Sequence, residues 1–270
     1  MPITRILKTI FFSLLILQLS VVNAAMMFER RGSIWLEGEI NAGDLEKWVM
    51  PAFKNTKGKN SIFLNSAGGD VEEAMKIGRY FKKNEFEVSV AYRDSCYSSC
   101  VFLLAGGVER HAVGKVGIHR PYFGSLDKSL TISQIKEFRE KINLNLKTYL
   151  MEMDINPSLV DVMNSYPPES MKILNDEELR NFRLDVKDAN YEEKEVAKQA
   201  YTYNMTSSEW RVKSANAHAQ CQGNKDEHCF VMKIFNISKS EAVIRIERFS
   251  DKCNGDTNFC FRKHVARGEK

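Results

Sequence analysis

The chain has 270 residues, of which 43% are hydrophobic and 27% are charged, and its formal net charge is +4. This near balance of charges gives no electrostatic case for a nucleic-acid partner, which would favour a strongly basic surface. The length exceeds that of a typical single domain, so we expect one sizeable core and a smaller appendage.

The first 24 residues have the pattern of a secretory signal peptide. Arg5 and Lys8 precede an apolar run from Ile10 to Val22, and the small-residue pattern Val22-Asn23-Ala24 follows, which predicts cleavage after Ala24. An uncleaved membrane anchor is the alternative, but the run is shorter than the roughly 20 residues of a spanning helix. Cleavage would lower the net charge from +4 to +2, because residues 1 to 24 hold two basic residues and no acidic one. We expect a periplasmic or secreted protein with no stable membrane span after cleavage.

Between Ser33 and Pro121, short β-like runs alternate with helical ones. The runs at 33–40, 61–65, 87–93 and 115–121 are apolar and rich in β-branched residues. Between the second and third lies a segment, 70–84, whose apolar residues recur at helical spacing. These residues are Val71, Ala74, Met75, Gly78 and Phe81. The alternation predicts an α/β fold with crossover connections.

Three further helices follow. Thr131 and Gln134 have the spacing of a capping box and open a long helix with an apolar side typical of a core or a subunit interface. That side consists of Ile132, Ile135, Phe138, Ile142, Leu146, Tyr149 and Met153. Asn156-Pro157 predicts a second helix start, and Asn175, followed by three acidic residues, predicts a third.

Beyond Asp188 the chain becomes charged and loosely helical, and four of the six cysteines lie between 221 and 260. Strand-like runs at 229–236 and 241–249 predict a small β appendage braced by disulfides. A zinc site is the alternative, but the spacings match no Cys-x2-Cys pattern, and export favours disulfides. Its ligands would come from His218, Cys221, His228, Cys229, Cys253, Cys260 and His264. We divide the chain into a signal peptide (1–24), an α/β domain (25–188) and the C-terminal region (189–270).

Three short motifs in the α/β domain can carry chemistry together. The glycine pair in 65–70 "NSAGGD" lies between a strand and a helix, where free backbone N–H groups can face an oxyanion. Ser98 follows a strand at a turn into a helix, where its hydroxyl can be exposed and the N–H of Ser99 can join the oxyanion hole. His119 ends a later strand and can act as the base that serine requires. The alternatives are a helix-capping role for Ser98, Ser99 as the nucleophile, and a structural role for His119 or His111.

Cys96 and Cys100 flank this serine. Export favours a mutual disulfide over thiol nucleophiles in a cysteine-type site. We expect such a bridge to clamp the turn that presents Ser98. The connectivity of all six cysteines cannot be read from their spacing.

Taken in order, these motifs resemble a known family. "SIFLNSAGG" resembles a strand followed by "NSPGG", Ser98 with Phe102-Leu103-Leu104 resembles a serine followed four residues later by "FLL", and Ile118-His119-Arg120-Pro121 resembles "IHQP". Further along, "LNDEELRNFRLDV" is similar to "LSAEEAVEYGLID". Residues 34 to 186 thus resemble the proteolytic subunit of Clp protease, a serine peptidase of the crotonase-like superfamily. The Cys-x-Ser-x-Cys pattern is also similar to exported Clp-like proteins of Gram-negative bacteria.

The resemblance implies a fold, an activity and a set of partners. The fold would be a spiral of β-strands and crossover helices, with the cysteine-containing appendage added. Ser98 would be the nucleophile and His119 the general base, with Gly68 or Gly69 and the Ser99 N–H as the oxyanion hole. The resemblance implies a peptide or protein substrate, a homo-oligomer, and no cofactor or metal. Because the family's ATPase-binding N-terminal segments have no counterpart here, we expect no ATPase partner.

The substrate would run along the strand edge after Gly69 and around Tyr122, Phe123 and Gly124. The sequence departs from the family at two positions of the site. Met171 stands where the family has its triad aspartate, with Glu169 close by, and Cys100 replaces a glycine.

Two other functions remain open at this point. A catalytically inactive protein could keep the peptide groove for recognition or assembly, and the missing aspartate favours this alternative. An acyl-CoA enzyme would use the two N–H donors on an enolate, but it gives Ser98 and His119 no role, and CoA is scarce outside the cytoplasm.

Overall fold

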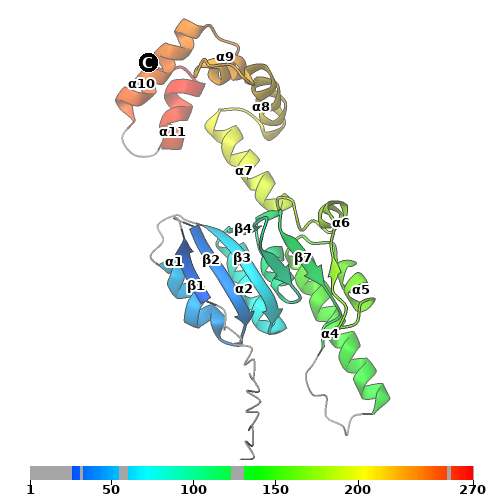
Figure 1. Cartoon of the computed structure of the whole chain (residues 1–270). Helices are drawn as coiled ribbons and strands as arrows, with labels where there is room; N and C mark the ends of the chain where they lie inside the picture. Colours follow the sequence, from blue (N-terminus) through cyan, green and yellow to red (C-terminus); the bar gives the residue numbers. More distant parts are fainter. Residues whose placement is uncertain (1–25, 31–32, 55–59, 123–130, 254–256, 270) are drawn as a thin grey trace, which may run out of the picture.

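A computed structural model describes residues 26–30, 33–54, 60–122, 131–253 and 257–269 (Figure 1). The predicted signal peptide lies outside the described residues. The described part confirms the predicted α/β class, because helices pack on a mixed, branched sheet of eight strands. The strands are β1 (Met26–Arg30), β2 (Ser33–Ile40), β3 (Ser61–Gly69), β4 (Glu87–Val90), β5 (Ser95–Tyr97), β6 (Glu109–Ala112), β7 (Lys115–Ile118) and β8 (Lys172–Ile173). The helical elements of the α/β part are η1 (Leu45–Val49), α1 (Met50–Lys54), α2 (Val71–Lys83), α3 (Cys100–Ala105), α4 (Ile132–Glu152), α5 (Leu159–Asn164) and α6 (Asp176–Asn181).

The sheet branches at β3. β1 pairs antiparallel with β2, and β2 pairs parallel with β3. The first residues of β3 pair with β4, which pairs with β6, whereas Ser66 further along β3 pairs with Cys96 of β5. β5 and β7 are parallel neighbours, and β8 joins β7 in antiparallel orientation. The residues that follow β5 and β7 therefore leave the sheet at the same edge, where ligands of parallel sheets commonly bind.

Helices α2 and α3 approach each other over two glycines. A Cβ atom on Gly106 would lie 2.3 Å from the carbonyl oxygen of Gly78, so a larger residue at Gly106 would force the helices apart. Tyr149 of α4, which is fully buried, donates a 2.6 Å hydrogen bond to the carbonyl of Phe102 in α3. These contacts fix α3, the helix that follows the candidate serine.

The capping box predicted at Thr131 is confirmed, and the helix start predicted at Asn175 also has a capping box. The side chain of Thr131 accepts from the Gln134 N–H at the start of α4, and that of Asn175 accepts from the Glu178 N–H at the start of α6. The helix predicted at Asn156-Pro157 begins at Leu159.

Only the C-terminal half of the α4 stripe lies in the core. Leu146 is 1% exposed and Tyr149 is fully buried, but Ile132 is 88% exposed. The N-terminal half of α4 projects beyond the sheet (Figure 1), so the sheet does not cover its apolar side.

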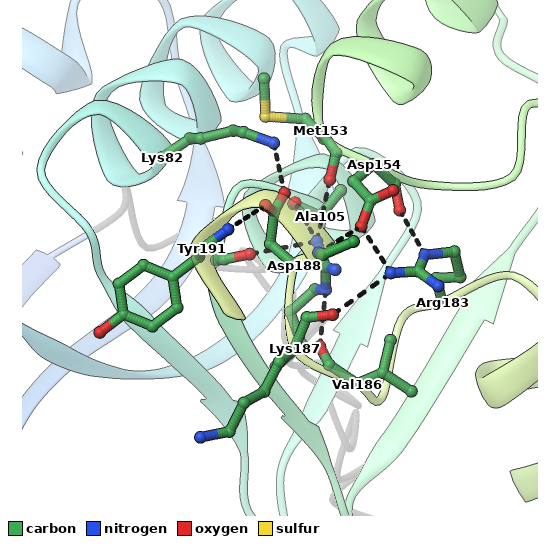
Figure 2. A network of polar contacts seen from close by, with 12 residues as sticks. Lys82, Ala105, Met153, Asp154, Arg183, Val186, Lys187, Asp188 and Tyr191 are labelled. Carbon is green, nitrogen blue, oxygen red and sulfur yellow. Dashed lines mark hydrogen bonds and ion pairs between the residues drawn. The ribbon is translucent and has the colours of Figure 1, made fainter. Parts of the chain in front are cut away.

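A buried ionic joint ties the α/β part to α7 (Ala189–Thr202) (Figure 2). Asp188 caps α7 by accepting from the Tyr191 N–H, and its second oxygen lies 2.5 Å from the Lys82 ammonium. Burial alone would raise the pKa of Asp188, but these two contacts hold that pKa below its ordinary value. The same joint includes Asp154, which pairs with Arg183 at 2.6 Å and accepts from the first N–H of α7.

Arg110 lies beneath this joint and is 1% exposed. Its guanidinium donates to the carbonyls of Ala105, Gly107, Met153 and Val186, so it connects α3, α4 and the segment before α7. Burial lowers the pKa of Arg110 to about 10, which leaves it charged at neutral pH.

The C-terminal region is helical, and the predicted β appendage is wrong. Beyond α7 the chain forms α8 (Ser207–Cys221), α9 (Cys229–Phe235), α10 (Lys239–Lys252), α11 (Thr257–Phe261) and η2 (Arg262–Ala266), here called the C-terminal helical module. Figure 1 shows it beyond the far end of α7 from the sheet. The two apolar runs that resemble strands are α9 and α10. In α10, Ala242, Ile246 and Phe249 recur at helical spacing and pack on the module's small core, so tertiary burial outweighs the β-branched composition.

Among the described residues, no helix has the length and apolar character needed to cross a membrane.

Candidate active site

Ser98 follows strand β5 directly, and Ser99 separates it from helix α3. Its backbone has a positive φ of 55°, which is uncommon for a residue other than glycine, and its N–H donates a 2.9 Å hydrogen bond to the carbonyl of Gly117 in β7. Such a conformation survives only where the surroundings enforce it. The residues from Cys96 to Cys100, here called the serine turn, therefore present Ser98 in a fixed, strained bend.

A disulfide joins the two ends of the serine turn. The predicted Cys96–Cys100 bridge is present, with 5.2 Å between the Cα atoms, and both cysteines are fully buried. The bridge ties β5 to the first residue of α3. The alternative of Cys96 or Cys100 as a thiol nucleophile is therefore wrong.

The two serines differ in exposure. Ser99 is 1% exposed and its hydroxyl is buried without a partner, whereas Ser98 is half-buried. Neither caps α3, because Ser99 occupies the N-cap position without a side-chain hydrogen bond and none joins the Ser98 hydroxyl to the helix. The capping alternative is wrong, and the enclosure of the Ser99 hydroxyl favours Ser98 as the residue that a substrate can reach.

Gly68 lies directly against the serine turn. With φ at 98°, a Cβ atom at Gly68 would lie 2.8 Å from the Cβ of Ser98 and 2.9 Å from the N of Ser99. At Gly69, a Cβ atom would instead meet the carbonyl oxygen of Ile40 in β2, 2.1 Å away. Only glycine fits at either position.

The oxyanion donors predicted from the sequence are only partly available. The Gly68 N–H already donates to the Ser66 hydroxyl at 3.1 Å, and that hydroxyl donates to the Gly38 carbonyl at 2.5 Å. Among the described residues, the Ser99 N–H has no acceptor. The Ser99 N–H is therefore available to bind an oxyanion that forms next to Ser98.

His119 follows β7 at the same edge of the sheet and is 7% exposed. Its Nδ1 lies 2.9 Å from the carbonyl oxygen of Arg120. Because a carbonyl only accepts, Nδ1 carries the proton and the lone pair lies on Nε2, the tautomer that a general base requires. In the described part of the chain, no hydrogen bond joins His119 to Ser98.

No carboxylate among the described residues bonds to His119. Met171, at the position of the family's aspartate, lies over Gly117, with its Sδ 2.8 Å from where a Cβ of that glycine would be. Glu169 is exposed and has no hydrogen bond to the imidazole. The Arg120 carbonyl therefore occupies the orienting role, a contact that side-chain motifs do not reveal.

Of the other predicted residues, His111 lies apart from this site, Tyr122 lies beside it, and the rest lie outside the described residues. His111 is an exposed residue on β6, 3.4 Å from Glu87, and not the buried structural histidine considered from the sequence. Tyr122 is 67% exposed, with its ring centroid 6.3 Å from that of His119. Phe123 and Gly124 lie outside the described residues.

A cavity of about 160 Å³ adjoins the site on the side of Arg120 and Tyr122. Its far wall comes from the exposed half of α4 and from the end of α5, including Arg139, Asn143 and Asn164. No motif in the sequence marks these residues, because their convergence depends on how α4 crosses the end of β7.

The four C-terminal cysteines form the disulfides Cys221–Cys229 and Cys253–Cys260. The zinc alternative is wrong, and the described residues contain no group of side chains suited to a metal ion. The predicted disulfide bracing is confirmed. With all six cysteines paired, the chain fits a protein that folds in an oxidising compartment.

No protein-family model matches this sequence, and a search of curated proteins finds no match to it.

Proposed function

We propose that the chain is an exported serine peptidase of the Clp-like type, with a crotonase-type arrangement of its α/β domain. One observation carries this proposal. A half-buried serine in a strained turn and a histidine with Nδ1 protonated leave adjacent parallel strands at one edge of the sheet. The three disulfides support action in the periplasm or outside the cell.

The proposed reaction is acyl transfer to Ser98. The Ser98 oxygen attacks the peptide carbonyl while Nε2 of His119 takes its proton, and the Ser99 N–H binds the oxygen that gains negative charge. His119 then gives the proton to the leaving amine as the C–N bond breaks. Water, activated by the same histidine, frees the acyl group and restores the serine. A rotation of either side chain must first bring Ser98 and His119 into hydrogen-bond contact.

A carbonyl in place of the triad carboxylate has a definite consequence. It fixes the tautomer of His119, but it stabilises the imidazolium formed during attack less well than a negative charge does. We therefore expect a slower enzyme than a complete Ser-His-Asp triad would give. Peptide or protein substrates, self-association and the absence of an ATPase partner complete the proposal.

Covalent labelling with a fluorophosphonate probe tests this function. The mature, disulfide-intact wild type is compared with Ser98→Ala, Ser99→Ala and His119→Ala, next to a known serine peptidase. We expect labelling of the wild type and of Ser99→Ala, and none of the other two. Labelling that survives Ser98→Ala, or a folded wild type that stays unlabelled, would refute the proposed nucleophile.

A second function, a catalytically inactive peptide-binding protein, is favoured by one observation. His119 contacts neither a carboxylate nor Ser98 among the described residues. An unlabelled but folded wild type that binds peptides would support this second function.

A further inference from the structure

The cavity beside His119 has a cationic character that the proposed reaction leaves unexplained. Arg120 lies on one side and Arg139 of α4 on another. Within the described residues, no carboxylate forms an ion pair with either arginine, although the neighbouring Lys136 and Lys147 have such partners. Glu169 follows Pro168 on the rim and pairs with neither. Guanidinium groups around a cavity that have no carboxylate partner among the described residues can attract an anion from a ligand.

Uncharged donors and apolar surface complete this cavity, here called the Arg120 pocket. Asn164 donates a 3.1 Å hydrogen bond to the side-chain oxygen of Asn143, which leaves the Asn143 NH₂ group as a further donor. Phe138 and Ile142 line the pocket beside these amides. Apolar walls with a few converging donors suit a short carbon chain that ends in a carboxylate.

Arg120 connects the pocket to the candidate base. Its carbonyl accepts from Nδ1 of His119, while its N–H donates to the Tyr166 carbonyl at 2.8 Å. The wall of the pocket therefore begins one residue after His119, on a backbone fixed on both sides. A peptide that places its scissile bond at Ser98 and His119 has its neighbouring side chain within reach of this wall.

We infer that the Arg120 pocket binds an acidic side chain, glutamate or aspartate, of the residue next to the scissile bond. This inference rests on the proposed function for its catalytic meaning, but it concerns binding. Bidentate contacts between guanidinium and carboxylate groups are stronger than the contacts of a neutral amide. The pocket should therefore distinguish glutamate from the isosteric glutamine.

Equilibrium binding tests this inference without requiring catalysis. Four fluorescein-labelled pentapeptides, Ala-Ala-X-Ala-Ala with X as Glu, Gln, Leu or Lys, are titrated against the Ser98→Ala protein and followed by anisotropy. We expect the glutamate peptide to bind about tenfold more tightly than the glutamine peptide at low salt. This preference should shrink as salt rises, because screening weakens exposed ion pairs.

Matched variants show which side chains cause the preference for the glutamate peptide. Arg139→Gln and Arg120→Gln should each bring the affinity for the glutamate peptide close to the affinity for the glutamine peptide. Lys141→Gln, a charge loss on the same helix outside the pocket, should keep the preference. Fluorophosphonate labelling of the arginine variants on a Ser98 background reports separately whether the candidate active site is intact.

The outcomes separate the two proposals. Equal binding of the glutamate and glutamine peptides, a preference for leucine, or no binding of any peptide would overturn the acidic specificity even if Ser98 is labelled. A glutamate preference that depends on Arg139 would uphold it even if Ser98 is unreactive. In that case the proposed peptidase function alone would fail.

Discussion

The serine turn and the C-terminal helical module are each closed by short-range disulfides, but the bridges lie in different surroundings. Cys96 and Cys100 belong to the large core of the α/β part, which is stable through burial of many apolar side chains. In the module, the largest cluster of buried apolar residues has three members, with partly buried side chains packed around them: Val231, Ala242 and Val265. A core of that size stabilises little on its own, so small modules depend on cross-links. The comparison predicts that the first bridge shapes the candidate active site, whereas the other two maintain the fold of the module.

The largest effect is expected at the joint between the two regions. Asp188→Asn removes the buried partner of the Lys82 ammonium, and breaking a buried pair costs about 3 kcal/mol or more. We expect the melting temperature at pH 7 to fall by roughly 6 to 12 °C in calorimetry.

The pH dependence of the Asp188 effect has a definite sign. The folded pKa of Asp188 lies below its ordinary value, so its stabilisation is present above the unfolded pKa and is lost as pH falls through the folded pKa. The stability difference between wild type and Asp188→Asn should therefore be constant near neutral pH and shrink as the pH falls below the ordinary pKa of an aspartate. A stability difference that grows as the pH falls would contradict a stabilising ion pair between Asp188 and Lys82.

Removing the Cys221–Cys229 disulfide tests whether the module depends on its bridges for stability. The double variant Cys221→Ser/Cys229→Ser should destabilise the module by about 2 to 5 kcal/mol and expose α8 and α9 to limited proteolysis. The core residues 60–122 should stay protected from hydrogen exchange.

The matched variant Cys96→Ser/Cys100→Ser should have the reverse pattern. The module should stay protected, and fluorophosphonate labelling of Ser98 should slow by about tenfold or more as the turn relaxes. Unchanged labelling would show that the bridge does not shape the site.

The sequence predicted features that depend on local chemistry. The capping box at Thr131 and the helix start at Asn175 depend on side chains that bond to backbone groups three residues away, and the helix after Asp70 follows from its apolar spacing. The residues around Ser98 predict a strand-to-helix turn, and Ser98 does follow a strand and precede α3, but that strand is the short β5 and not the predicted run at 87–93.

Features that depend on distant contacts were missed. β1 and β8 are antiparallel edge strands defined by their partners, and β8 has only two residues. The apolar runs of α9 and α10 fit a strand or a helix equally well until the packing of the module decides between them. The carbonyl that orients His119 and the position of Arg139 depend on backbone placement, which no side-chain motif encodes.

A smaller effect distinguishes close packing from backbone strain near Ser98. Gly68→Ala places a Cβ at positive φ and against Ser98, whereas Gly43→Ala places one at a φ of 89° with nothing within 4 Å. Gly43→Ala should cost about 1 to 2 kcal/mol from strain alone and leave labelling unchanged. Gly68→Ala should cost more and abolish labelling. Equal behaviour of the two variants would show that Gly68 is required only for its conformation.

The last prediction concerns which ring nitrogen of His119 carries the proton, and its measurement does not alter the fold. ¹⁵N spectra of the histidine rings, with His119 assigned through His119→Gln, report which ring nitrogen carries the proton. We expect a protonated Nδ1 and an unprotonated Nε2 in the neutral ring, because the Arg120 carbonyl can only accept from Nδ1. A neutral ring with the proton on Nε2 would leave no lone pair for Ser98 and would contradict the base role. The expected tautomer together with an unreactive Ser98 would mean that orientation alone, without a carboxylate, does not activate the serine.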